Sequence, residues 1–145
     1  MTWNDVSKLT ALCASQACPV REGCLRYQGW LALPQEKTQW LFVSPSQAAQ
    51  AGAEGCPMFA SAAPVRMAVG FAKAMRRMPA GNVRQCVDDL ARALGVGQRL
   101  VYKMRKGNRA LTPEEQTLVA RVLAEHGAPQ PVEFDGYEER YLWPD

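Results

Sequence analysis

The chain has little of several residue types on which common functions depend. It contains a single histidine, His126, at the end of a segment with helical periodicity. A histidine there would favour the helix dipole, so we interpret it as a helix cap, and Ser-His-Asp or Cys-His catalysis would have no second histidine to use. Long apolar runs are missing, and the first residues lack the basic start and apolar run of a secretory signal. We therefore expect a cytoplasmic protein that is not an enzyme and has no membrane partner.

Cysteine, in contrast, is well represented for the size of the chain. The 145 residues, 48% of them hydrophobic, can build one compact core or two very small ones. Disulfides are rare in a reducing compartment. The five cysteines therefore indicate a metal site or thiol chemistry and not a disulfide framework.

Positive charge is concentrated in the middle of the chain. The net charge of +3 hides three regions, because residues 1–63 are neutral overall, residues 64–111 carry +9 and residues 112–145 carry −6. Such an excess of lysine and arginine is typical of a segment that holds a polyphosphate such as DNA. A solvated basic face, balanced by the acidic C-terminal segment, is the alternative interpretation.

Composition and periodicity divide the chain into three regions. We expect a four-cysteine metal-binding region over residues 1–63, a helical domain over 64–127 and an acidic, aromatic segment over 128–145 that docks on the body of the protein. Local patterns further predict, in chain order, helices over 6–14 and 25–30, a strand over 37–43, a brief helical turn over 47–53 and an amphipathic helix over 65–78.

The strongest local signal is a pair of short helices within residues 88–109. Ala91 is small enough for the second helix to pack against it, and Gly95 can adopt the positive φ that ends a helix and reverses the chain. Val101 and Met104 fall on the inward face of the second helix. The other face presents hydrogen-bond donors expected of a helix that enters a major groove, namely Gln98, Arg99, Tyr102, Lys103 and Lys106.

A further helix follows with a full set of start signals. Thr112 is expected as its N-cap, Pro113 as its first residue and Glu115 as the capping-box partner. Together with helices over 65–78 and 83–94, it completes a predicted four-helix arrangement. The expected fold class is therefore mainly α: an N-terminal four-cysteine metal-binding half with little strand, then a C-terminal four-helix, helix-turn-helix-like bundle.

Residues 64–127 resemble the Cro/phage-repressor type of helix-turn-helix domain. Gly97 departs from that pattern, because a polar N-cap is usual where it opens the second helix. The resemblance implies binding to double-stranded DNA, commonly by a dimer. It implies that base edges are addressed by Gln98, Arg99, Tyr102 and Lys103, and that phosphates are contacted by Arg76, Arg77, Lys106, Asn108 and Arg109.

Four cysteines in the N-terminal region form a candidate metal site. Cys13, Cys18, Cys24 and Cys56 lie within 44 residues, and four thiolates can complete a tetrahedral Zn²⁺ site or hold an iron–sulfur cluster. A region with a thin core is where a metal contributes most to folding. Buried thiols without a metal are the remaining alternative, and that is our interpretation of Cys86.

Two further resemblances concern this region. The run CPVREGCLRY resembles the ligand segment of WhiB-like iron–sulfur regulators over about ten residues, although their paired cysteines and Gly-Trp-Gly-Gly turn are missing here. With the Cys-Pro at residue 56 and the aromatic C-terminus, the whole chain also resembles a family of small uncharacterised bacterial proteins. That family carries no assigned activity.

The leading functional hypothesis is a small DNA-binding transcriptional regulator with a structural zinc site. A non-catalytic adaptor is the second hypothesis, in which the helix-turn-helix scaffold binds another protein or a second copy. The third is a redox-sensing regulator, which requires an iron–sulfur cluster in place of zinc. The steepness of the salt dependence of duplex binding separates the first hypothesis from the second.

Overall fold

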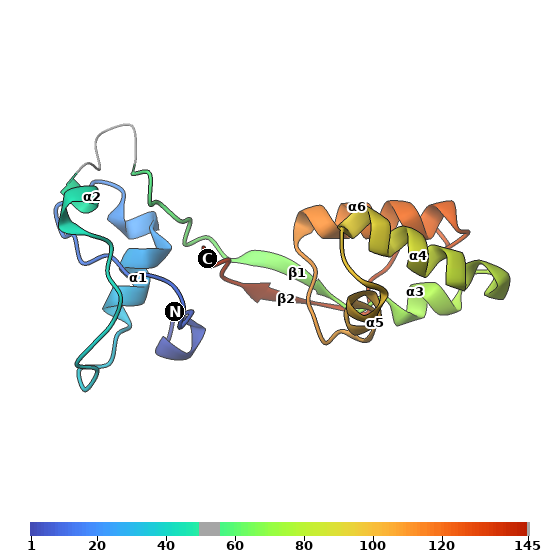
Figure 1. Ribbon diagram of the computed structural model, residues 1–145, viewed down its shortest axis with the longest axis horizontal. Helices are drawn as coiled ribbons and strands as arrows, with labels where there is room; N and C mark the ends of the chain where they lie inside the picture. Colours follow the sequence, from blue (N-terminus) through green and yellow to red (C-terminus); the bar gives the residue numbers. More distant parts are fainter. Residues whose placement is uncertain (50–55, 145) are drawn as a thin grey trace. The chain divides into compact units, whose positions relative to one another are not determined.

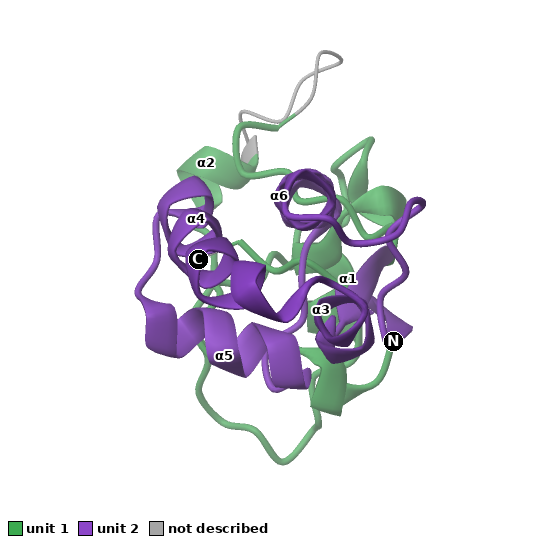
Figure 2. Cartoon of the chain, turned by 90° about the vertical axis from the view of Figure 1, so that its right-hand side faces the viewer, with its two compact units in different colours: residues 1–64, 141–145 green, residues 65–140 purple. Residues whose placement is uncertain are grey.

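The computed structural model describes residues 1–49 and 56–144, with the side chain of residue 49 left out. The chain forms two compact units: unit 1 contains Met1–Pro64 and Tyr141–Asp145, and unit 2 contains Val65–Arg140. Figure 1 shows the elements in chain order, and Figure 2 colours the two units. No helix of the described residues is long and apolar enough to cross a membrane.

Unit 2 holds most of the regular structure. Its elements are β1 (Val65–Val69), α3 (Ala72–Arg76), a 3₁₀ turn (Ala80–Asn82), α4 (Val83–Leu94), α5 (Gln98–Lys106), α6 (Pro113–Glu125) and β2 (Gly136–Arg140). The expected start of α6 is confirmed: Thr112 is its N-cap, Pro113 opens it, and Thr112 and Glu115 form a reciprocal capping box.

The amphipathic helix expected over residues 65–78 is wrong in its first part, where the chain forms β1, and only residues 72–76 are helical, as α3. β1 pairs antiparallel with β2, in a register that joins Val65 to Arg140 and Val69 to Gly136. Gly70 has a φ of 78°, which ends the strand before α3 begins. Helical periodicity could not anticipate the strand, because its hydrogen-bonding partner lies near the other end of the unit.

The core of unit 2 is continuous. Each of its helices and β1 contributes buried apolar residues, including the fully buried Phe71, Leu90, Val101 and Leu123. Leu111 joins the core through backbone hydrogen bonds in both directions with Ala68, at 3.0 and 2.8 Å. The resulting scaffold fixes α4 and α5 against α3, α6 and the sheet.

Unit 1 contains much less regular structure. Its described elements are 3₁₀ turns at Trp3–Asp5 and Arg21–Gly23 and short helices α1 (Leu25–Leu31) and α2 (Pro45–Ala49). The helical turn expected over 47–53 overlaps α2 and otherwise lies outside the described residues. The helix expected over 25–30 is confirmed.

Two other expectations for unit 1 are wrong, and the two segments concerned meet in a single bridge. Residues 6–14 form no helix and residues 37–43 form no strand. The Leu12 N–H donates to Leu41 O at 2.9 Å, and the Val43 N–H donates to Leu12 O at 2.8 Å. This isolated bridge between Leu12 and Phe42 uses the backbone groups that a local helix would need.

The C-terminal segment returns to unit 1 after β2. Thr10 donates a hydrogen bond to the carbonyl of Pro144, and the Trp143 indole donates to the carbonyl of Asp5 at 2.6 Å. A Cβ added to Gly29 would lie 2.7 Å from the Trp143 ring. Gly29 therefore lets the indole pack directly against α1.

The expected fold class needs correction on two points. The C-terminal region is not a four-helix bundle, because its helices pack with a two-stranded sheet whose second strand follows α6. The N-terminal region is not built as a metal-binding half. Among residues 1–49 and 56–144, no three His, Cys, Asp or Glu side chains are arranged to hold a metal ion. Its four cysteines come from separate loop and turn segments, which do not set their sulfurs into one tetrahedron.

Candidate nucleic-acid interface

Two helices joined by a tight turn form the centre of the candidate interface. α4 ends at Gly95, whose φ of 67° is left-handed, and the Val96 N–H donates to the carbonyl of Ala91 at 2.9 Å. Such a bond satisfies a carbonyl that the last helical turn leaves free. Gly97 then caps α5 in an extended conformation, without a side-chain hydrogen bond. The sequence predicted both helices and the turn between them.

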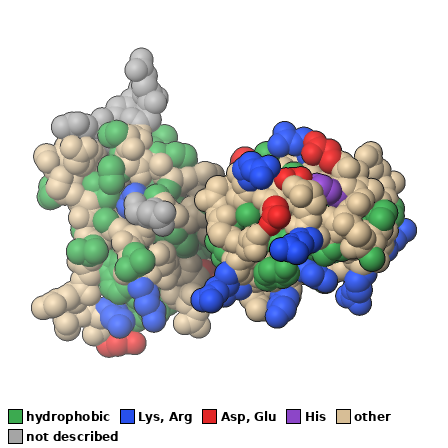
Figure 3. Space-filling view, turned by 45° about the vertical axis from the view of Figure 1, so that its right-hand side comes forward, with side chains coloured by type: hydrophobic (Ala, Val, Ile, Leu, Met, Phe, Trp, Pro, Cys, Tyr) green, Lys and Arg blue, Asp and Glu red, His purple; other side chains and the backbone are tan. Residues whose placement is uncertain are grey.

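Packing determines which face of α5 meets solvent. Val101 and Met104 are fully buried, whereas Tyr102 is 44% exposed. The outward face of α5, with the loop that follows it, is composed of exposed polar and basic residues: Gln98, Arg99, Tyr102, Lys103, Lys106 and Asn108. We call this set the α5 face. In Figure 3, Lys and Arg side chains lie along the lower edge of unit 2, with most of the visible carboxylates above them.

The cations of the α5 face have no carboxylate partner in the described structure. The ion pairs found there do not include Arg99, Lys103 or Lys106. Gln98 is the one member with a side-chain partner, because its amide donates to the carboxylate of Asp88 on α4. That contact joins positions ten residues apart, on two different helices, and no local sequence pattern predicts it.

Arg109 lies apart from the α5 face and is already paired. Its guanidinium donates two hydrogen bonds to the Glu115 carboxylate, at 2.8 and 2.9 Å. These bonds raise the pKa of Arg109, with burial acting against them. A bidentate pair of this kind holds a guanidinium in one geometry. Arg109 therefore anchors the start of α6 in this structure, which is a different role from contacting phosphate.

Arg76 and Arg77 are exposed near the end of α3. The other end of α3 is next to the end of α5, because the Phe71 N–H donates to the carbonyl of Arg105 at 3.1 Å. α3 and α5 thus belong to one connected part of unit 2, while α6 lies on the other side of that unit (Figure 2). The two arginines extend the positive charge beyond the α5 face.

The acidic residues of unit 2 have other partners. Asp135 accepts hydrogen bonds at 3.0 Å from the backbone N–H groups of Ala72 and Lys73, at the start of α3. Asp89 accepts a hydrogen bond from His126 at 2.7 Å, which lowers the pKa of Asp89, and a bond from Gln85 adds to this effect. The expected capping position of His126 is confirmed, but its side chain also ties α6 to α4.

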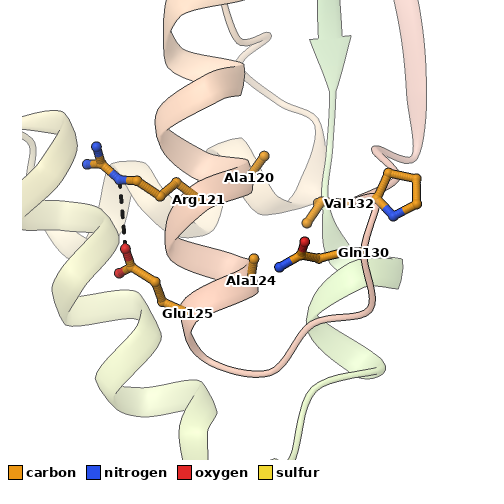
Figure 4. Close-up of a pocket in the computed structure, with 7 residues that line it drawn as sticks. Ala120, Arg121, Ala124, Glu125, Gln130 and Val132 are labelled. Atoms are coloured by element: carbon orange, nitrogen blue, oxygen red, sulfur yellow. Dashed lines mark ion pairs between the residues drawn. The ribbon is translucent and has the colours of Figure 1, made fainter.

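A surface groove beside α6 contains no cluster of reactive groups. It measures about 420 Å³ and lies between α6 and residues 130–132. Figure 4 shows Ala120, Ala124 and Val132 on its walls, with the Arg121–Glu125 ion pair at 3.9 Å on the outer side of the helix. Small apolar side chains and one exposed ion pair give this groove no chemistry of its own.

The structure brings the four N-terminal cysteines to one small cavity. Cys13, Cys18, Cys24 and Cys56 all line a space of about 20 Å³ in unit 1. Cys86 is elsewhere, fully buried in the core of unit 2. Burial raises the pKa of the Cys86 thiol to about 11, with a contribution from Asp89. Zinc and the iron–sulfur cluster stay predictions for the other four.

Sequence reasoning missed Arg26, which lines the same cavity. Its side chain is 7% exposed and donates hydrogen bonds to the carbonyls of Met58 at 2.9 Å and Ala11 at 2.6 Å. A single arginine two residues after Cys24 gives no pattern that distinguishes it from a surface residue. Only the fold shows that it is buried.

Comparison with known proteins gives one match. The model of a family of unknown function, DUF6078, matches residues 1–143. The chain therefore belongs to this family, which confirms the expected membership of an uncharacterised family over nearly the whole chain. No curated protein and no solved structure matches the chain.

Proposed function

We propose that this protein binds double-stranded DNA through unit 2, as a transcriptional regulator, with the α5 face in the major groove. The observation that carries the proposal is the α5 face itself, in which three cations stand exposed beside Tyr102 and Gln98. Arginine, lysine and glutamine donate to base edges in the major groove, and α-helices fit that groove. The resemblance to helix-turn-helix domains of the Cro/phage-repressor type supports the same assignment.

The surroundings of α5 support this orientation. Its inward residues, Val101 and Met104, are locked in the core, so the helix is a rigid element with one free face. A site on a rigid helix holds its side chains more accurately than a loop does. Arg76 and Arg77 on α3 supply further positive charge, which fixes a protein on duplex DNA through the phosphates without reading sequence.

The acidic C-terminal residues form no ion pair with the α5 face in the described structure. β2 carries Glu138 and Glu139, but the carboxylate of Glu138 pairs with Arg140 of the same strand. The Asp135 carboxylate accepts a hydrogen bond from the Ala72 N–H at the start of α3. The adaptor hypothesis, in which the acidic segment covers the basic helices, finds a contact at α3, where Asp135 binds the first residues of the helix. Among the described residues the segment forms no ion pair with the α5 face.

The decisive experiment measures binding of the full chain to a labelled generic duplex as a function of salt. Each phosphate contact contributes about 0.9 to the slope of log affinity against log salt. We expect Lys106→Gln to reduce the steepness of the slope by about 0.9. Arg121→Gln is the matched control, because it removes one positive charge from the exposed surface of α6 and should leave the slope unchanged.

Recognition of the DNA base sequence requires a separate variant. Arg99→Ala should lose about 1–3 kcal/mol of discrimination at one base pair, while its binding to unrelated duplex falls much less. A selection from random duplexes with both proteins would show this. An unchanged preference would remove Arg99 from the base-reading set. A slope near zero for the unaltered chain would contradict DNA binding altogether and favour the adaptor.

A further inference from the structure

The cavity in unit 1 that the four cysteines line contains mainly thiol and apolar side chains, with the hydroxyl-bearing Ser15 and Tyr27 as its uncharged oxygen groups. Its walls contain Cys13, Cys18, Cys24 and Cys56, with no carboxylate and no histidine among the lining residues that the structure describes. Thiolates select thiophilic ions such as Zn²⁺, whereas Mg²⁺ and Ca²⁺ require oxygen ligands. All four cysteines of unit 1 meet here, although they are distributed over 44 residues of sequence.

The size of the cavity favours one ion. A cavity needs roughly 10–15 Å³ to hold a single water molecule, and this one offers about 20 Å³. A space for one small sphere is the size expected for a single metal ion surrounded by sulfur. The cavity also adjoins an apolar groove of about 490 Å³, which shares Cys13, Ser15 and Val43 with it.

Arg26 supplies an independent observation. Its buried guanidinium is held by two backbone carbonyls. In the part of the chain that the structure describes it forms no ion pair with a carboxylate. A buried charge without a counter-charge is costly. Four thiolates around one Zn²⁺ carry two net negative charges, so such a centre would supply the anion that Arg26 lacks.

The backbone at Cys56 is arranged for a sulfur that accepts hydrogen bonds. The Met58 N–H donates to Cys56 Sγ at 3.3 Å, and the Phe59 N–H donates to the Cys56 carbonyl at 2.9 Å. This turn, Cys56-Pro57-Met58, points an amide at the thiol. A negatively charged sulfur accepts such a bond more strongly than a neutral one.

We propose that the four cysteines close on a single Zn²⁺ ion taken up into this cavity, forming an induced site whose charge is balanced by Arg26. The site is not preformed, because no three of the four sulfurs are arranged to share an ion among the described residues. Cys13, Cys18 and Cys56 lie in irregular segments and Cys24 in an isolated bridge with Ser61, so the proposal requires the three irregular segments to move their sulfurs toward Cys24. This inference concerns unit 1 and does not depend on DNA binding by unit 2.

The test uses the full chain, reduced and stripped of metal, and titrated with Zn²⁺ in competition with a chromogenic chelator. We expect one Zn²⁺ per chain. Cys18→Ala should weaken binding by more than about 100-fold, since even indirect partners of a metal contribute 10- to 100-fold. Cys86→Ala is the matched control and should bind Zn²⁺ like the unaltered chain.

Co²⁺ provides a second measurement on the unaltered chain, which remains valid if Cys18→Ala fails to fold. Tetrahedral thiolate coordination should give thiolate-to-cobalt charge transfer and strong visible bands. Absence of those bands, or of stoichiometric Zn²⁺ uptake, would overturn the proposal. So would an equal loss of binding in Cys86→Ala, or purification of the chain with iron and inorganic sulfide in a cluster.

Discussion

The two units of this protein are built by different means. Unit 2 has a continuous apolar core to which four helices and a strand contribute. In unit 1 the described buried apolar residues are few: Val6, Leu12, Cys24, Leu25 and Tyr27, joined by the polar Thr10 and Arg26. Burial of apolar area is the main favourable term in folding. Unit 2 can therefore rely on its core, whereas unit 1 depends on specific hydrogen bonds, on the returning C-terminal segment and, as we propose, on an ion.

The chain offers a separate probe for each unit. All four tryptophans, at positions 3, 30, 40 and 143, belong to unit 1. The three longest helices, α4, α5 and α6, belong to unit 2. Tryptophan fluorescence therefore reports unfolding of unit 1, and far-ultraviolet circular dichroism reports mainly unit 2. The difference between the units can be tested with substitutions that move one signal and leave the other.

The largest effect is expected in the core of unit 2. Phe71 is fully buried, and replacing a buried phenylalanine by alanine costs about 3–5 kcal/mol. Phe71→Ala should lower the urea midpoint seen by circular dichroism and leave the fluorescence midpoint in place. Equal shifts in both signals would show that the two units unfold as one.

A smaller effect on stability, detected only by tryptophan fluorescence, is expected at Gly29. A Cβ there would lie 2.7 Å from Trp143 and 2.8 Å from Leu12, and overpacking costs about 1–3 kcal/mol. Gly29→Ala should shift the fluorescence midpoint downward. Gly23→Ala is the control, because a Cβ at Gly23 meets nothing within 4 Å. If both variants behave alike, Trp143 is not important for the stability of unit 1.

Acid should weaken unit 2 through Asp89. Hydrogen bonds, first from His126, lower the pKa of Asp89 below its ordinary value of 3.8. The stabilisation is therefore present above that value and is lost as the pH falls through the lowered pKa. The circular-dichroism midpoint should fall as the pH decreases from about 5 to below 3, and it should fall less in Asp89→Asn. Glu139→Gln, which alters an exposed carboxylate, is the control, and its midpoint should decrease with pH as much as that of the unaltered chain.

The smallest effect is expected at the start of α5. Gly97 caps the helix without a side-chain hydrogen bond, and a Cβ there meets nothing within 4 Å. Gly97→Ser should stabilise unit 2 by a few tenths of a kcal/mol, about 0.2–0.5. Gly95→Ala should do the opposite, because the φ of Gly95 is 67°. Thermal unfolding followed by circular dichroism would resolve the pair.

Sequence patterns predicted well where the signals are local. α4, the turn at Gly95, α5 and the capped start of α6 follow from apolar periodicity, glycine and the Thr112–Glu115 capping box. These features involve residues within a few positions of one another. The predictions failed where the structure depends on contacts between residues far apart in the sequence. β1 needs a partner strand near residue 138, and Leu12 pairs with a segment thirty residues away.

The candidate sites follow the same rule. The exposed face of α5 could be predicted because burial of Val101 and Met104 fixes which side of the helix is free. The pairing of Arg109 with Glu115 was not visible, because a sequence shows a charge but not its partner. In unit 1 the cysteines were recognisable individually, whereas their shared cavity and the buried Arg26 appear only in the fold.

The most direct test of the account measures both unfolding transitions of the full chain at low salt, with and without excess duplex DNA. A ligand stabilises the unit that it binds, by about 2.7 kcal/mol at a hundred times its dissociation constant. We predict that duplex raises the circular-dichroism midpoint and leaves the tryptophan fluorescence midpoint unchanged. A shift of the fluorescence midpoint alone, or no shift in either signal, would contradict DNA binding by the α5 face.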